Sequence, residues 1–170
     1  MRPSPSSFGE FYKNYISLVP QDEVLDALRL SALHSSNFWR SIPTVKGDYR
    51  YAEGKWSIKE LLQHIIDTER IFSYRALAFA RGEKTALPGY DENAYADNCL
   101  AESRGLEELV DELELVRKCT ISLFESFEKS VLDNIGMASE SNLSVRAAGF
   151  IIVGHEIHHI NVVKERYLDD

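Results

Sequence analysis

The fold is decided by residues 144–168, which read SVRAAGFIIVGHEIHHINVVKERYL. Apolar side chains recur there every three or four positions, so they collect on one face of a helix. That face comprises Ala148, Ile151, Ile152, His155, His159, Val162 and Val163. The two histidines lie in the middle of the face. The pattern therefore predicts a long helix whose buried side carries two imidazole rings.

His155 and His159 are one helical turn apart, so both rings can point at a single ion. An i, i+4 histidine pair is a usual way to build a metal chelate on a helix. The alternative is a core pair of neutral rings, each of which needs a buried partner, because an unpaired polar group costs about 1–3 kcal/mol. The pair by itself leaves both interpretations open. His158 lies at the edge of the face and is less well aimed.

Three further segments carry the same helical periodicity. Residues 21–41 begin with acidic side chains and end before Pro43, and residues 103–130 repeat leucine at helical spacing. The third segment starts at a capping box, Ser57 to Glu60, and runs to about Gly82. Four helices of about 20 residues or more predict an all-α four-helix bundle. The irregular stretch of roughly twenty residues before residue 103 is long enough for a crossover between the second and third helices.

The rest of the chain predicts little regular structure. Residues 1–9, with Pro3 and Pro5, are expected to be a loose lead-in. Residues 133–142 are expected to form a loop, and no convincing strand pair is visible. The whole of residues 1–170 is predicted to be a single domain.

Composition excludes several classes of protein. Apolar residues make up 44% of the 170 residues and charged residues 27%, which is ordinary globular composition. The net charge of -8, with no basic cluster, argues against a nucleic-acid partner. No apolar run approaches the roughly 18 residues that a membrane span needs. Two cysteines are too few for a disulfide framework, so we expect a reducing cytoplasm.

The two metal-site motifs on the last helix are incomplete. Residues 155–159 match H-E-x-x-H, the zinc-protease motif in which Glu156 would activate water. Such proteases take a later third ligand, but only eleven residues follow His159 and none is a histidine. A di-iron bundle needs two Glu-x-x-His motifs from separate helices, and only Glu156 to His159 supplies one. A third ligand must therefore come from upstream.

The upstream histidines are His34 and His64. His64 follows the cap Ser57 by seven residues, and its helix face is mixed, with Glu60 and Asp67 beside apolar side chains. Either carboxylate could accept the second imidazole N–H or bind the ion itself, or could simply face solvent. For His34 we expect a surface or packing role.

Three segments together resemble one known family. They are GKWSIKELLQHIIDTERI at 54–71, LPGYDEN at 87–93 and GHEIHH at 154–159. In this order and spacing they are similar to the DinB-like superfamily, whose members are described as metalloenzymes. The resemblance extends from about residue 20 to residue 168. The separate motifs are short, and their specificity comes from their order.

The resemblance implies a four-helix bundle of up-down-down-up topology, with the crossover between the second and third helices. It implies a metal site on His64, His155 and His159, holding zinc or nickel. Relatives include thiol S-transferases that use bacillithiol and a mycothiol-dependent isomerase, and the resemblance favours a homodimer. One departure stands out, because many relatives follow the last histidine with Arg-Gly-Gln where this chain has residues 160–162, Ile-Asn-Val.

Three neutral histidines leave an open position on a divalent ion, as in catalytic zinc sites. That position could lower the pKa of a bound water or thiol, and Glu156, Asp67 or Asp91 could handle the proton. We therefore expect a divalent-metal-dependent enzyme, with a thiol S-transferase acting on a small electrophile as the leading reaction. The alternative is a non-catalytic metal-binding or stress-response module.

Aromatic side chains gather in the segments flanking the second helix and could line a substrate pocket. They are Tyr49, Tyr51, Trp56, Tyr90 and Tyr95. Among them we single out Tyr90, with its neighbour Asp91, as substrate-binding candidates. The alternative role for these aromatic rings is to cap the core of the bundle.

Overall fold

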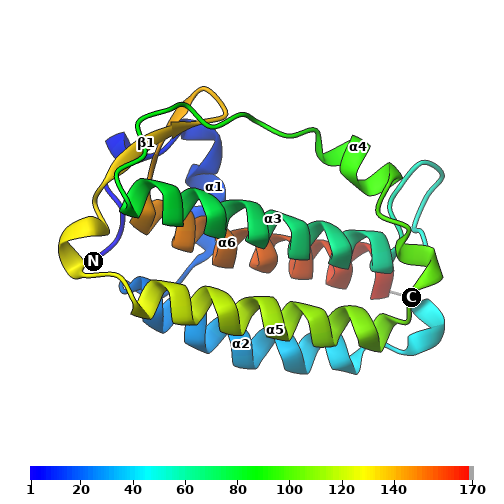
Figure 1. The fold of residues 1–170 in the computed structure, drawn as a ribbon. Coiled ribbons are helices and arrows are strands. Elements are labelled where there is room, and N and C mark those ends of the chain that lie inside the picture. Colours follow the sequence, from blue (N-terminus) through cyan, green and yellow to red (C-terminus); the bar gives the residue numbers. More distant parts are fainter. Residues whose placement is uncertain (169–170) are drawn as a thin grey trace.

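The computed structural model describes residues 1–168 and consists mostly of helices. Four helices of 18 to 23 residues pack side by side within that range (Figure 1). They are α2 (Val24–Ser41), α3 (Ile58–Ala80), α5 (Leu106–Glu125) and α6 (Val145–Val163). Each lies inside or close to a segment predicted from the sequence to be helical. The predicted bundle is therefore present.

Shorter elements join and cover the bundle. Two short helices, α1 (Lys13–Leu18) and α4 (Glu92–Asp97), lie in segments for which no helix was expected. The 3-10 turns are Pro5–Ser7, Glu10–Tyr12, Thr44–Lys46, Ala101–Ser103 and Lys129–Val131, and Lys164–Leu168 forms a π-helical turn after α6. No helix within residues 1–168 is long and apolar enough to cross a membrane.

The helix termini show why the long helices start where they do. At the start of α3, Ser57 Oγ accepts a bond from the Glu60 N–H at 3.2 Å and Glu60 Oε2 accepts one from the Ser57 N–H at 2.6 Å. This is the predicted capping box. At the start of α6, Ser144 Oγ accepts a bond from the Ala147 N–H at 3.0 Å. These caps satisfy amide groups that a helix cannot bond internally.

The prediction of no strand pair was wrong. Strands β1 (Ile135–Ala138) and β2 (Ser141–Ser144) form an antiparallel hairpin inside the segment expected to be a loop. Ser139 and Glu140 connect them with φ of 49° and 60°, the left-handed pair that a tight hairpin turn requires. Because neither position is Asn or Gly, the turn carries no sequence signal. The protein is thus a helical bundle with a small sheet, not purely all-α.

Residues 1–9 pack against the bundle, although we expected a loose lead-in. Arg2 donates through Nη1 to the Val19 carbonyl at 2.7 Å and through Nη2 to the Ile16 carbonyl at 2.6 Å. Phe8 is buried and forms a β-bridge with Leu143 of β2. The order of this segment comes from contacts with distant parts of the chain, which its own composition does not reveal.

The segment between α3 and α5 runs along the length of the bundle (Figure 1). It starts beside the hairpin, where the Leu87 N–H donates to the Met137 carbonyl at 2.9 Å and the Ser139 N–H donates to the Leu87 carbonyl at 3.2 Å. It passes through α4 before α5 begins. The segment therefore covers one side of α3, with which α4 is in contact.

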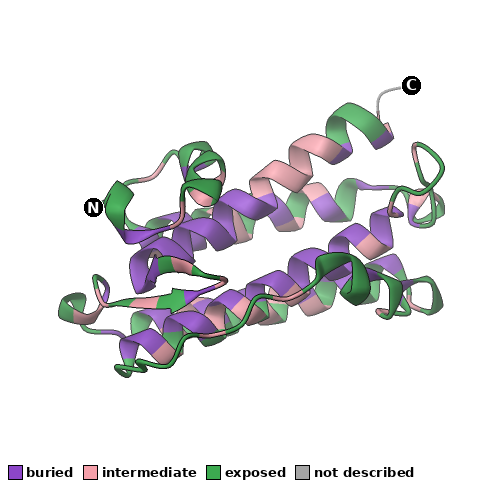
Figure 2. Ribbon diagram, turned by 90° about the horizontal axis from the view of Figure 1, so that it is seen from above, coloured by how far each residue is buried: buried purple, intermediate pink, exposed green. Residues whose placement is uncertain are grey.

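A layer of polar side chains divides the buried interior into two apolar clusters. One cluster contains Phe72, Phe124 and Phe150 beside the hairpin, and the other contains Trp39 and Leu109 at the opposite end. The layer between them consists of buried histidine, glutamate, arginine and threonine side chains. They are His64, Thr68, Glu69, Arg117, Thr120, His155 and Glu156. In Figure 2 the first part of α6 is buried, and its later turns are only half-buried.

Candidate metal centre

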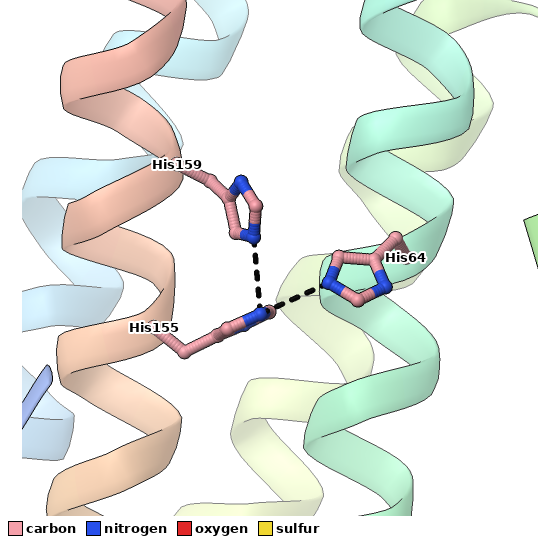
Figure 3. A group of neighbouring side chains, drawn as sticks. All are labelled: His64, His155 and His159. Carbon is pink, nitrogen blue, oxygen red and sulfur yellow. Dashed lines mark hydrogen bonds between the residues drawn. The ribbon is translucent and has the colours of Figure 1, made fainter. Parts of the chain in front are cut away.

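Three histidines from two helices converge in the polar layer. His64 projects from α3 toward His155 and His159 on α6 (Figure 3). The Nε2 atom of His155 lies 3.0 Å from Nε2 of His64 and 3.0 Å from Nε2 of His159. One ligand nitrogen from each ring lies within 4.8 Å of the other two. Within residues 1–168 these three side chains form the group whose ligand atoms lie close enough together to hold one ion. All three had been predicted as metal ligands.

Hydrogen bonds alone do not satisfy this arrangement. An imidazole nitrogen in the ring plane carries either one N–H or one lone pair. Nε2 of His155 therefore cannot donate to one ring and also accept from the other. A cation between the rings would accept all three lone pairs. Zinc–nitrogen bonds of about 2.0–2.1 Å place tetrahedral ligand atoms roughly 3.3 Å apart, close to the two 3.0 Å separations. The residues present fit a divalent ion.

The three rings are neutral at ordinary pH. Burial lowers the pKa of His64 to about 4. Burial, followed by repulsion from His64 and His158, lowers the pKa of His159 to about 3. The pKa of His155 also falls well below the usual value, first through burial and then through the neighbouring histidines. Metal binding needs deprotonated imidazoles, so the site is in its ligating form without having to release protons.

Aromatic rings hold two of the histidines in place. The Trp56 ring lies 4.9 Å from that of His64, and the Tyr15 ring lies 5.4 Å from that of His155. Tyr15 reaches this position because α1 crosses α6 at Gly154, where any Cβ would overlap the Tyr15 carbonyl. A glycine is therefore required one position before His155.

The other two histidines lie outside the triad. The His158 ring packs 5.4 Å from Tyr15 and 5.0 Å from the His159 ring. It lines a neighbouring cavity with His159, but its nitrogens do not belong to the converging group. His34 is exposed on α2.

Two cavities reach the triad from different directions. One of about 130 Å³ is lined by His155, Tyr90 and Arg75 among others. The second, of about 280 Å³, is lined by His159 and Trp56 among others. The two cavities share no lining residue. A small molecule could thus approach the site from either side.

The structure places the predicted substrate-binding pair in different settings. Tyr90 lines the cavity that reaches His155, and its hydroxyl lies 2.7 Å from Oγ1 of Thr68. Burial raises the pKa of the Tyr90 phenol, so the hydroxyl keeps its proton. Asp91 lines neither cavity described above. Its Oδ1 accepts bonds from the Asn93 and Ala94 N–H groups and caps α4.

The proposed acid–base carboxylates are not part of the converging histidine group. Glu156 is completely buried, and its Oε2 accepts bonds from Arg117 Nη2 and Ser31 Oγ, both at 2.9 Å. Asp67 Oδ1 accepts a bond from Gln63 Nε2 at 2.9 Å. Burial raises the pKa of the Asp67 carboxyl.

A buried ion-pair cluster that was not predicted from the sequence lies next to the site. Arg117 donates through Nε and Nη2 to both carboxylate oxygens of Glu69, each at 2.8 Å, and through Nη2 to Glu156. A signal for it exists in the sequence. Arg117 occupies one position of an apolar stripe on α5, at a spacing of three or four residues from its neighbours. The stripe is Leu106, Val110, Leu113, Arg117, Thr120 and Phe124. A charge there must be buried and needs a partner.

Two solved structures share this fold at low sequence identity. YfiT from Bacillus subtilis, described as a probable metal-dependent hydrolase with an unusual four-helix bundle topology, matches with a TM-score of 0.68 at 17% identity. The match covers 97% of this chain and 90% of YfiT. The mycothiol-dependent maleylpyruvate isomerase matches with a TM-score of 0.66 at 14% identity. That match covers 85% of this chain but only 61% of the isomerase. Among curated protein sequences no match was found.

The family assignment rests on the sequence itself. The family model for the DinB superfamily matches residues 28–163, which include all three converging histidines and all four long helices except the first four residues of α2. The chain belongs to the DinB superfamily.

Proposed function

We propose that this protein is a divalent-metal-dependent enzyme in which His64, His155 and His159 hold one zinc or nickel ion. The observation that carries the proposal is the convergence of three neutral Nε2 atoms, two pairs of which are 3.0 Å apart. Three protein ligands leave a position for substrate, which is the pattern of catalytic sites. We also propose the up-down-down-up order for the four long helices. The long connection from α3 to α5 in Figure 1 supports this order.

We further propose that the reaction transfers a low-molecular-weight thiol to a small electrophile. Two cavities that share no lining residue reach the triad, one at His155 and one at His159. A transfer needs two organic substrates, whereas a hydrolysis needs one organic substrate and water, so two cavities favour transfer. The mycothiol-dependent isomerase provides an example of thiol chemistry on a similar fold.

A bound divalent ion would supply a Lewis acid that lowers the pKa of a thiol or water in its open position. The chain's own residues prepare the site for it. Trp56 and Tyr15 pack on the rings of His64 and His155 and fix their orientation. Tyr90 and Thr68 offer paired hydroxyls to the substrate in the cavity at His155.

Three carboxylates have different roles in this proposal. We assign proton transfer to Asp67, which is half-buried on α3 and whose carboxyl pKa is raised by burial. The Glu156 carboxylate already accepts hydrogen bonds from Arg117 and Ser31. We therefore give it a positioning role, in which it holds α6 against its neighbours. Asp91 acts through α4, which it caps beside Tyr90. A homodimer in the cytoplasm remains a prediction.

The test has two stages. Purified protein is first analysed for metal by mass spectrometry, and we expect about one equivalent of zinc or nickel in the wild type and strong loss in His155→Ala. His34→Ala, which changes an exposed histidine, serves as the matched control and should retain metal. Unchanged metal content in His155→Ala would refute the site.

The metal-loaded protein is then tested with bacillithiol, mycothiol, glutathione and coenzyme A, each combined with monochlorobimane. Conjugation that depends on metal and on His155 supports a thiol S-transferase. Stoichiometric metal without turnover of any pair would instead indicate the non-catalytic metal-binding or stress-response module.

A further inference from the structure

Arg75 is a deeply buried cation without an acidic partner. Its side chain on α3 is 2% exposed. Through Nη2 it donates to the Pro88 carbonyl at 2.9 Å and to Ser139 Oγ at 3.0 Å, and its guanidinium lies 5.0 Å from the centre of the Phe72 ring. All of these partners are neutral. Within residues 1–168, Arg75 forms no ion pair with a carboxylate.

The other buried cations of the described chain behave differently. Arg117 pairs with Glu69 and Glu156. Arg146 pairs with Asp133, and Lys59 pairs with Asp48. A buried charge is costly unless it is paired. The missing negative charge at Arg75 is therefore unusual within this protein, and it indicates that an external anion completes the site.

Arg75 lines the cavity of about 130 Å³ that also reaches His155. Only Nη2 is engaged by the protein, so Nε and Nη1 keep hydrogen-bond donors available. Three residues that bear hydroxyl groups, Tyr12, Thr68 and Tyr90, line the same cavity. A guanidinium with free donors is suited to a carboxylate, to which it gives charge-assisted hydrogen bonds.

The size of the cavity limits the ligand. About 130 Å³ corresponds to roughly four water molecules. Arg75 and His155 both line this cavity, so a molecule that fills it can contact both side chains. The one carboxylate on the cavity lining is Glu92, which is exposed on α4 and lies at the rim. Repulsion from Glu92 is weakened by solvent, so it does not cancel the buried charge of Arg75.

We propose that Arg75 is the receptor for a carboxylate of the substrate, so that this enzyme acts on a small carboxylic acid bound between Arg75 and the histidine triad. The inference rests on the proposed function, because it makes this cavity one of the two substrate sites. It adds the charge and size of the substrate, neither of which the triad specifies. Arg75 is then a substrate-binding residue, and Ser139 of the hairpin turn positions it.

The test compares propionate with propionamide, which have the same shape but differ in charge. Binding is followed by chemical-shift titration at constant ionic strength, in both metal-loaded and metal-free protein. We expect propionate to bind about 10- to 100-fold more tightly than propionamide, as charge-assisted hydrogen bonds to a buried guanidinium allow. The preference should be present in both forms of the protein.

Arg75→Gln should remove the preference for propionate, and Arg75→Lys should retain part of it. Arg70→Gln is the matched control, because it removes the same charge from an exposed position of α3 and should leave the preference intact. Circular dichroism establishes that each variant is folded. If Arg75→Gln does not fold, the inference is judged by the affinities of the wild type for propionate and propionamide.

Equal affinity of the wild type for the two ligands would overturn the inference, as would an unchanged preference in folded Arg75→Gln. The metal-free arm separates this outcome from failure of the proposed function. If the protein holds no metal but still prefers propionate through Arg75, the carboxylate site stands and the metal enzyme does not. If the protein binds metal but shows no preference for propionate, the proposed metal site stands and the carboxylate site does not.

Discussion

Arg117 on α5 donates through Nη2 to Glu69 on α3 at 2.8 Å and to Glu156 on α6 at 2.9 Å. One guanidinium thus joins the two helices that carry the histidine triad, and it contacts α6 one position after His155. All three side chains are almost completely buried. The relative placement of α3 and α6, on which convergence of the three rings depends, is tied to this cluster.

Removal of Arg117 should therefore destabilise the protein strongly. Arg117→Met leaves two carboxylates buried without a counter-charge, and breaking such a pair costs about 3–5 kcal/mol. Urea denaturation monitored by circular dichroism measures the free energy of unfolding. Arg29→Ala is the control, because it breaks an exposed ion pair with Glu125 and should cost about 1 kcal/mol or less. Similar losses in the two variants would contradict the importance of the buried cluster.

The metal-free protein should lose stability as the pH falls below neutrality. Folded His64 and His159 have pKa values lowered to about 4 and about 3, whereas an unfolded imidazole titrates near 6.5. Between these values the unfolded chain binds protons that the folded chain does not, so acid favours unfolding. Each group contributes up to about 1.4 kcal/mol per pH unit in this window.

Urea denaturation at pH 7.5, 6.0 and 5.0 measures this dependence. Because other groups titrate as well, the informative quantity is the difference between variants. His64→Ala should show a shallower loss between pH 7.5 and 5.0 than the wild type, and His34→Ala should not. An identical pH dependence in wild type and His64→Ala would show that His64 is not buried in its neutral form.

Metal should stabilise the folded protein through the triad. A ligand that binds only the folded state at 100 times its Kd adds about 2.7 kcal/mol to the free energy of unfolding. We expect a chelator to lower the Tm of the wild type and to leave that of His159→Ala unchanged, since that variant lacks a ligand. Differential scanning fluorimetry with and without zinc measures the effect. A Tm that is insensitive to chelator in the wild type would support histidines that satisfy one another in a core.

Glycine at position 140 should stabilise the hairpin. Glu140 is exposed and has φ of 60°, a conformation that an L-residue adopts at a cost and glycine adopts freely. Glu140→Gly should raise the free energy of unfolding by about 0.5–1 kcal/mol. Ser139 is left in place because its hydroxyl accepts a bond from Arg75. In the control Glu128→Gly, φ of -66° suits any residue, so glycine there should destabilise the protein.

Local patterns in the sequence predicted the four long helices, the capping box at Ser57 and the pairing of His155 with His159. All of these depend on residues within a few turns of one another, and helical periodicity reports such relationships directly. The choice of His64 came from the absence of a later histidine and from the family resemblance. The structure then placed its Nε2 3.0 Å from that of His155.

The hairpin, the packed N-terminal segment and the partners of the buried charges were decided only by the tertiary structure. The turn at Ser139 and Glu140 lacks the glycine or asparagine that usually marks such a bend, so its conformation follows from strand pairing and from burial of Leu143. Whether a charged side chain at a core position finds a counter-ion depends on which helices become neighbours. Arg117 meets Glu69 and Glu156, whereas Arg75 meets only neutral groups. These contacts join residues tens of positions apart, and no local pattern encodes them, because the energy of a buried charge depends on everything packed around it.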